Sequence, residues 1–180
     1  MQTTPFHIDM GRLVEPINQD DHVRGPDSAP VTLVEYGDYQ CPYCGQAYPI
    51  VEALLAERPD TVRFVFRHFP LTDLHPQAEI AAELAEAAGV RGQFWRAHGW
   101  LFTHQSQFDA QHLRGAAAEI DPSGGAERDL ERRAYDDRIR RDFISGVRSG
   151  VNGTPTFFIN GIRHDGGYSL PELLRAVDSA

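Results

Sequence analysis

The fold is decided by residues 31–44, which read VTLVEYGDYQCPYC. Residues 31–36 are mostly β-branched, aliphatic or aromatic and precede Gly37, which is typical of a buried strand. After Cys44, apolar residues recur at positions 47, 50, 51, 54 and 55, the spacing of an amphipathic helix. Pro42 suits the first helical position, where an N–H has no intrahelical partner. The stretch therefore predicts a buried strand that leads into a helix beginning at the two cysteines.

A second strand follows this helix. Pro49 lies inside the helical pattern and is expected to kink the helix, which Pro59-Asp60 then ends. Residues 62–66 read VRFVF, the pattern of another buried strand. Strand, helix and strand within about 36 residues form a βαβ unit, so we expect the two strands to be parallel.

The segment between Arg67 and Gly150 has the character of helices. Apolar stripes at helical spacing predict three helices, within residues 80–88, 94–102 and 113–120. Residues 126–149 predict one further, strongly charged helix, and we interpret its charges as a solvated face. In this helix an acid precedes a base by four residues, the favourable order, in Asp129–Arg133, Asp136–Arg140 and Asp137–Arg141.

The last thirty residues return to strands and end in a helix. Residues 156–159 and 162–164 flank Asn160-Gly161, which predicts a hairpin with a type I′ turn. Ser169 and Glu172 have the spacing of a capping box that opens the last helix. The element order indicates an α/β domain made of residues 31–66 and 151–180, an inserted helical domain at residues 67–150, and an N-terminal arm at residues 1–30 with an edge strand near residues 22–24.

Composition narrows the possible functions. The 180 residues carry a formal net charge of −9, which disfavours a nucleic-acid partner. All 17 basic residues are arginine, which excludes Schiff-base chemistry and a P-loop lysine. No apolar run approaches the ~18 residues of a membrane helix, so we expect no membrane insertion. As a separate expectation, we take the chain to be a monomer. The first ten residues lack the pattern of a signal peptide, so we expect a cytoplasmic protein unless an export sequence has been removed.

The two cysteines, Cys41 and Cys44, carry the predicted chemistry. Residues three apart share one face of a helix, so the two sulfurs can reach the ~2.05 Å of a disulfide. The partial positive charge at the helix start favours the Cys41 thiolate and lowers the pKa of this residue. Cys44 lies one turn deeper, so we assign attack to Cys41 and resolution of the mixed disulfide to Cys44. Two alternatives to this redox role stay open: the cysteines are half of a zinc site shared between two chains, or they are two inert residues of the core.

Four motifs occur in order along the chain: EYGDYQCPYC at 35–44, HFPL at 68–71, QFW at 93–95 and GVNGTPT at 150–156. On these residues the chain resembles the DsbA-like members of the thioredoxin superfamily. The resemblance implies a thioredoxin fold with an inserted helical domain and thiol–disulfide exchange through Cys41-Pro42-Tyr43-Cys44. It also implies protein thiols or disulfides as substrates, a redox-recycling partner, and no metal or organic cofactor.

The resemblance gives roles to three further residues. Pro155 is similar to the family's cis-proline, which faces the redox pair, and Thr154 would present its backbone to an extended substrate. An ordinary trans proline at the start of a strand is the alternative. Glu35 has the position of the family's buried acid, which would shuttle a proton for Cys44. The alternative is a strand glutamate that points to solvent.

Tyr43 departs from the best-known DsbA, which has histidine at this position. An imidazole donor to the Cys41 thiolate is therefore missing, and Cys-Pro-Tyr-Cys is also the glutaredoxin pair. Two other functions stay open: a glutaredoxin-like reductase of low-molecular-weight thiol mixed disulfides, and a redox-inert chaperone or interaction module. We interpret His68, His75 and His98 as structural rather than metal-binding residues.

Overall fold

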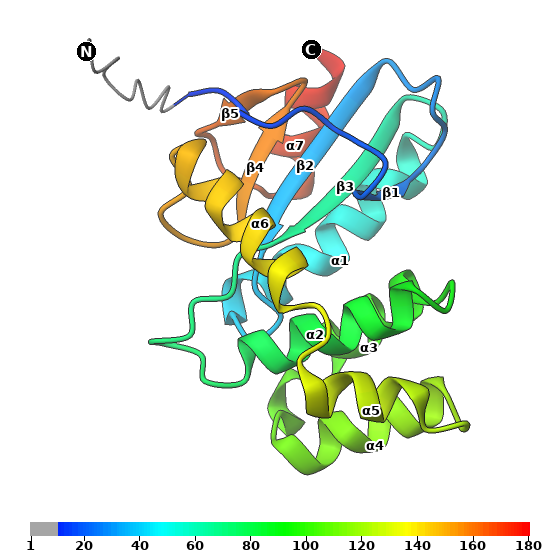
Figure 1. The fold of residues 1–180 in the computed structure, drawn as a ribbon. Coiled ribbons are helices and arrows are strands. Elements are labelled where there is room, and N and C mark those ends of the chain that lie inside the picture. Colours follow the sequence, from blue (N-terminus) through cyan, green and yellow to red (C-terminus); the bar gives the residue numbers. More distant parts are fainter. Residues whose placement is uncertain (1–10) are drawn as a thin grey trace, which may run out of the picture.

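The computed structural model describes residues 11–180, so the first ten residues of the predicted arm lie outside the description. Its centre is a five-stranded sheet with the strand order β1-β3-β2-β4-β5 (Figure 1). Strands β2 and β3 pair in parallel, as the βαβ pattern predicts, and the other neighbouring pairs are antiparallel. The strands are β1 (His22–Arg24), β2 (Val31–Gly37), β3 (Val62–His68), β4 (Thr156–Ile159) and β5 (Ile162–His164).

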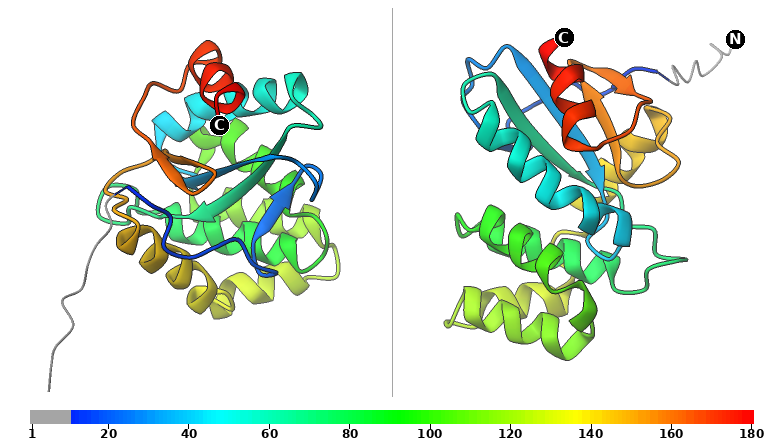
Figure 2. Two further views of the ribbon diagram at one scale, coloured as in Figure 1. Left: turned by 90° about the horizontal axis from the view of Figure 1, so that it is seen from above. Right: turned by 180° about the vertical axis from the view of Figure 1, so that it is seen from behind.

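Helices cover both faces of this sheet. Helices α1 (Pro42–Glu57) and α7 (Leu170–Asp178) lie on one face, and α6 (Asp136–Arg148) lies on the opposite face (Figure 2). Alternate residues of β2 serve the two layers: Leu33 belongs to the core with α1 and α7, while Val34 packs in a second cluster with Phe143 of α6. Burial on both faces explains why the strand patterns are almost continuously apolar.

The remaining helices form a block beyond one end of the sheet (Figure 1). The three helices predicted from apolar stripes are confirmed. Their buried residues belong to the same apolar cluster as those of α1, so the block packs directly against the helix that follows the cysteines. The block comprises α2 (Ala78–Gly89), α3 (Phe94–Thr103), the short 3₁₀ helix η1 (Gln105–Gln107), α4 (Ala110–Ile120) and α5 (Gly125–Arg132).

The single charged helix expected at residues 126–149 is wrong. The helix breaks at Arg133, which adopts a left-handed conformation with φ 48°, and α6 begins three residues later. The interpretation of a solvated face is also wrong at Asp142, which is 5% exposed. Its carboxylate accepts the backbone N–H of His68 at 3.0 Å and pairs with Arg138. A partner on β3, far away in the sequence, therefore decides the burial of this charge.

The C-terminal elements follow the sequence closely. Asn160 and Gly161 have φ values of 48° and 79°, as a type I′ turn requires, and β4 and β5 pair across them. Ser169 and Glu172 form the expected capping box at the start of α7. Strand β3 continues to His68, so it extends two residues into the inserted helical domain predicted at residues 67–150. The limits of the domains stay a prediction. Among the described residues, no helix combines the length and apolar character needed to cross a bilayer.

Candidate active site

Cys41 stands where β2 passes into α1. It is the N-cap residue of the helix, with extended backbone angles of −67° and 123°, and Pro42 occupies the first turn. Asp38 shapes the turn before it: its carboxylate accepts the N–H of Gln40 at 2.7 Å, and its carbonyl accepts the N–H of Cys41 at 3.1 Å. Its own N–H lies 3.5 Å from Cys44 Sγ. One aspartate thus ties both cysteines to the end of the strand.

The pKa of the Cys41 thiol is lowered to about 5. The largest cause is a hydrogen bond from Cys44, and the backbone N–H groups of Tyr43 and Cys44 at the helix start act in the same direction, while burial opposes them. Thr154 contributes as well. In the thiol form Cys41 donates to the Thr154 carbonyl at 3.4 Å, and the buried Thr154 hydroxyl has no partner among the described residues, so it is available to the thiolate.

Cys44 and Glu35 lie behind Cys41 in the core. Burial, followed by the hydrogen bond to Cys41 and the nearby Glu35, raises the pKa of the Cys44 thiol well above its ordinary value. Glu35 is 2% exposed, and burial raises the pKa of its carboxyl to about 8, with the negative charge of Cys41 adding to the effect. One of its oxygens has no hydrogen-bond partner among the described residues. Glu35 is therefore buried rather than facing solvent.

The two cysteines differ in charge state more than in exposure. Both are free thiols and both are buried, Cys41 at 3% exposure and Cys44 at 0%. Cys44 is the deeper of the two, as expected, and Cys41 Sγ lies 3.4 Å from the Thr154 carbonyl of the neighbouring loop. Tyr43 is the residue of the motif that does face solvent, with 60% of its surface exposed.

The Thr154–Pro155 peptide bond is cis, as the resemblance implies. The loop immediately precedes β4, which pairs with β2 at the centre of the sheet. The contact of the Thr154 carbonyl with Cys41 Sγ places this loop directly beside the redox pair. Residues 41, 44, 35, 154 and 155, which are far apart in the sequence, therefore meet at one end of β2.

Two residues of the site were not found from the sequence. The Gln105 amide of η1 donates to the carbonyl of Tyr39 at 2.7 Å and to that of Cys41 at 2.9 Å, which connects the helical block to the redox loop. Asp38 also binds His75 Nδ1 at 2.7 Å. The Asp38-to-Gln40 bond is a recognisable local turn motif. No local pattern marks Gln105, because its partners lie more than sixty residues away.

The three histidines considered for metal binding do not converge. His75 pairs with Asp38, while His98 Nδ1 forms a hydrogen bond with the Tyr39 hydroxyl at 3.0 Å inside a cluster of aromatic rings. Burial lowers the pKa of His98 well below its ordinary value, so its ring is neutral there. His68 lies instead beside Glu86.

A free cysteine pair at a helix start, beside a cis-proline loop and above a buried acid, defines a thioredoxin-like site. The chain matches the family model described as Thioredoxin over residues 17–179, and it belongs to that family. Its fold is the DsbA-like form of the thioredoxin fold, an α/β sheet with a helical block, as the resemblance implies.

Solved structures agree in fold. A thioredoxin-like oxidoreductase from Silicibacter pomeroyi DSS-3 is 28% identical, with a TM-score of 0.76 over 90% of this chain and 92% of that chain. The alpha-DsbA1 protein of Wolbachia pipientis is 21% identical, with a TM-score of 0.74 over 93% of each chain.

One curated relative is named as an ion antiporter rather than as a redox protein. The Na(+)/H(+) antiporter NhaA 1 of Salinispora arenicola is 49% identical over 170 residues, which cover 93% of this chain and 26% of that protein. The chain thus spans about a quarter of the length of the curated relatives it matches.

Proposed function

We propose that this chain is a thiol–disulfide oxidoreductase that exchanges disulfides with protein substrates. The observation that carries the proposal is the opposite shift of the two thiols: the pKa of Cys41 is lowered to about 5 and that of Cys44 is raised. Cys41 is therefore a thiolate at neutral pH, while Cys44 keeps its proton. Such a difference assigns the nucleophile and the resolving thiol to separate residues.

In the reducing direction, the Cys41 thiolate attacks one sulfur of a substrate disulfide, and the other substrate sulfur leaves as a thiolate. Cys44 then loses its proton and attacks Cys41 Sγ, which releases the second substrate thiol and leaves the Cys41–Cys44 disulfide. Two electrons pass from the pair to the substrate. The cis-Pro155 loop supports this step, since the Thr154 backbone beside Cys41 can accept an extended peptide by strand addition.

Glu35 fits the opposite direction. When a substrate thiolate attacks Cys41 of the disulfide, Cys44 leaves as a thiolate inside the core. The pKa of Glu35 is about 8, so its carboxyl holds a proton at neutral pH and can give it to the departing sulfur. The fold allows both directions, and the redox poise of the compartment and of the recycling partner selects one of them.

The test is to trap the mixed disulfide. Cys44→Ser protein should form a stable complex with a disulfide-containing substrate such as insulin, held through Cys41 and released by reductant. Cys41→Ser should trap nothing and should abolish insulin reduction. If Cys41→Ser retains its activity in cells, the redox-inert chaperone or interaction module becomes the better account.

A reductase of glutathione mixed disulfides is the second candidate. The Cys-Pro-Tyr-Cys sequence favours it, and Tyr43 is exposed beside the pair, where a small thiol can approach. Comparing the rates of reduction of insulin and of a glutathione mixed disulfide distinguishes the two substrates. A faster reaction with the glutathione compound would favour this candidate.

The antiporter name of the curated relatives is not carried over to this chain. Their match covers about a quarter of their length, and over nearly all of that stretch this chain matches the Thioredoxin model. We therefore propose redox chemistry, and no ion transport, for the chain itself.

A further inference from the structure

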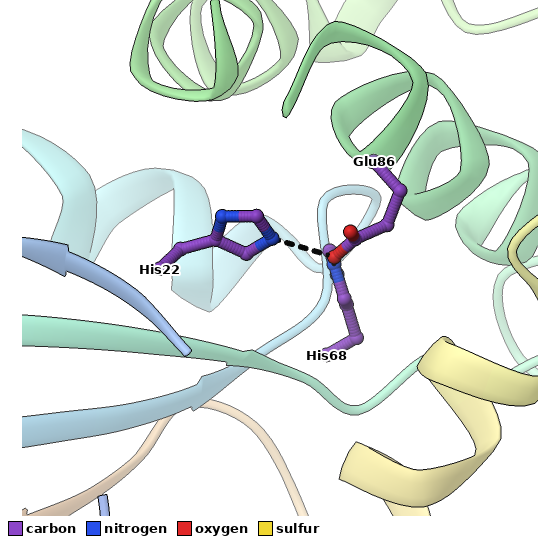
Figure 3. Close-up of side chains that lie close together, drawn as sticks. All are labelled: His22, His68 and Glu86. Carbon is purple, nitrogen blue, oxygen red and sulfur yellow. Dashed lines mark hydrogen bonds and ion pairs between the residues drawn. The ribbon is translucent and has the colours of Figure 1, made fainter. Parts of the chain in front are cut away.

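Two histidines and a glutamate converge away from the cysteine pair. His22 comes from the edge strand β1, His68 from the end of β3, and Glu86 from α2, and both rings point at the carboxylate (Figure 3). The Nε2 atoms of His22 and His68 lie 2.8 and 2.7 Å from the same oxygen, Glu86 Oε1. The three potential ligand atoms lie within 4.8 Å of one another.

We propose that His22, His68 and Glu86 form a binding site for a zinc-type divalent transition-metal ion, which for His68 replaces the purely structural role expected from the sequence. Two imidazole nitrogens and one carboxylate oxygen are a donor set that zinc accepts, with a water molecule as the fourth ligand. Hard cations such as Mg²⁺ prefer all-oxygen sites, so the nitrogen donors favour a transition metal. This site is separate from the proposed redox function and uses neither cysteine.

The geometry needs only a small adjustment to hold an ion. Metal–ligand distances of about 2.0–2.1 Å in a tetrahedral site place ligand atoms about 3.3 Å apart. The two nitrogen–oxygen distances of 2.8 and 2.7 Å would therefore open by about half an ångström. A metal ligand must present its lone pair, so any proton that Nε2 donates to the Glu86 carboxylate moves to Nδ1 or is released on metal binding.

The surroundings favour an ion at this position. The His68 side chain is 1% exposed and that of Glu86 is 6% exposed, whereas that of His22 is 18% exposed and leaves a route from solvent. Phe94 stacks on the His22 ring at 3.5 Å and lies edge-on to His68, so both imidazoles are held in place by one apolar side chain. Arg138 also lies near Glu86, but its guanidinium pairs with Asp142, which offsets its repulsion of a cation.

The three side chains come from three separate elements, and those of His68 and Glu86 are almost closed to water. A divalent ion would join β1, β3 and α2, and so fix the N-terminal edge strand to both the sheet and the helical block.

The experiment uses Cys41→Ser/Cys44→Ser protein, because a reduced cysteine pair binds zinc by itself. Zn²⁺ alone is titrated by calorimetry and Co²⁺ by its visible spectrum. We expect one ion per chain, a cobalt spectrum of four-coordinate nitrogen and oxygen ligation, and no binding of Mg²⁺. Replacing a ligand in His22→Gln or Glu86→Gln should weaken zinc binding by at least about 100-fold, since even second-shell changes cost 10- to 100-fold.

The matched control is His112→Gln. His112 pairs with Asp109 on the surface of α4 and should be replaced without loss of zinc affinity. Absence of saturable zinc binding to the cysteine-free protein would overturn the proposal, as would equal losses in His112→Gln and His22→Gln. If the ligand variants fail to fold, X-ray absorption of the zinc-loaded cysteine-free protein decides: two imidazoles are expected, and any other number contradicts the site.

Discussion

Removing the Cys44 thiol should raise the pKa of Cys41. The hydrogen bond from Cys44 is the largest cause of the lowered Cys41 pKa, and a hydrogen bond to a charged group contributes about 1.5–3 kcal/mol. One pKa unit corresponds to 1.36 kcal/mol, so losing this donor should shift the pKa by about one to two units. In Cys44→Ala protein we therefore expect Cys41 to titrate at about 6–7 instead of about 5.

Cys44→Ser is the matched variant, because its hydroxyl keeps a donor at nearly the same position. Its Cys41 pKa should stay within about one unit of the wild-type value. The assay is the ultraviolet absorbance of the thiolate, titrated in the reduced proteins, with Cys41→Ser as the blank that should show no transition near pH 5. Equal Cys41 pKa values in the Ala and Ser variants would refute the reasoning, since the donor would then have no effect.

Three further predictions concern neighbouring groups. Because the pKa of Glu35 is raised from 4.5 to about 8, the folded protein loses stability as pH rises from about 4.5 through 8, by at most about 5 kcal/mol. Glu35→Gln should remove this loss when the free energy of unfolding is measured by denaturant titration at several pH values. Parallel pH profiles of the variant and the wild type would contradict the prediction. Cys41 acts in the opposite sense: its depressed pKa stabilises the reduced protein above pH 9, and this advantage over Cys41→Ser should fade as pH falls through about 5. Gln105→Ala removes one donor from each of two carbonyls; the Tyr39 carbonyl loses its partner, while the Cys41 carbonyl keeps the N–H of Gly45 at 3.0 Å. The variant should cost about 1–3 kcal/mol and slow insulin reduction, whereas exposed Gln107→Ala should match wild type.

Local patterns predicted the elements that depend on local physics. The buried strands, the type I′ turn at Asn160-Gly161 and the capping box at Ser169 each follow from a few consecutive residues. The placement of Cys41 at a helix start also follows, because Pro42 and the apolar spacing after Cys44 leave little choice. The resemblance added the cis-Pro155 and the burial of Glu35, which no local pattern requires.

The sequence was least informative where a distant partner decides. Arg133 interrupts a pattern that is helical throughout, and Asp142 is buried because a backbone N–H of β3 meets it. Gln105 gains its role only when the helical block packs against the redox loop. His22 and His68 lie 64 and 18 positions from Glu86, so the convergence of the two histidines on one Glu86 oxygen has no signature in the sequence.

The central claim is that Cys41 and Cys44 exchange electrons as a pair, and a redox titration against glutathione with mass detection tests it most directly. We predict one two-electron transition that ends in an intrachain disulfide, two hydrogens lighter than the dithiol. A Cys41 pKa about two units below pH 7 should make the pair a stronger oxidant by about 60 mV than the same dithiol without that shift. Accumulation of a glutathione adduct on a single cysteine, or no oxidation at all, would contradict the account.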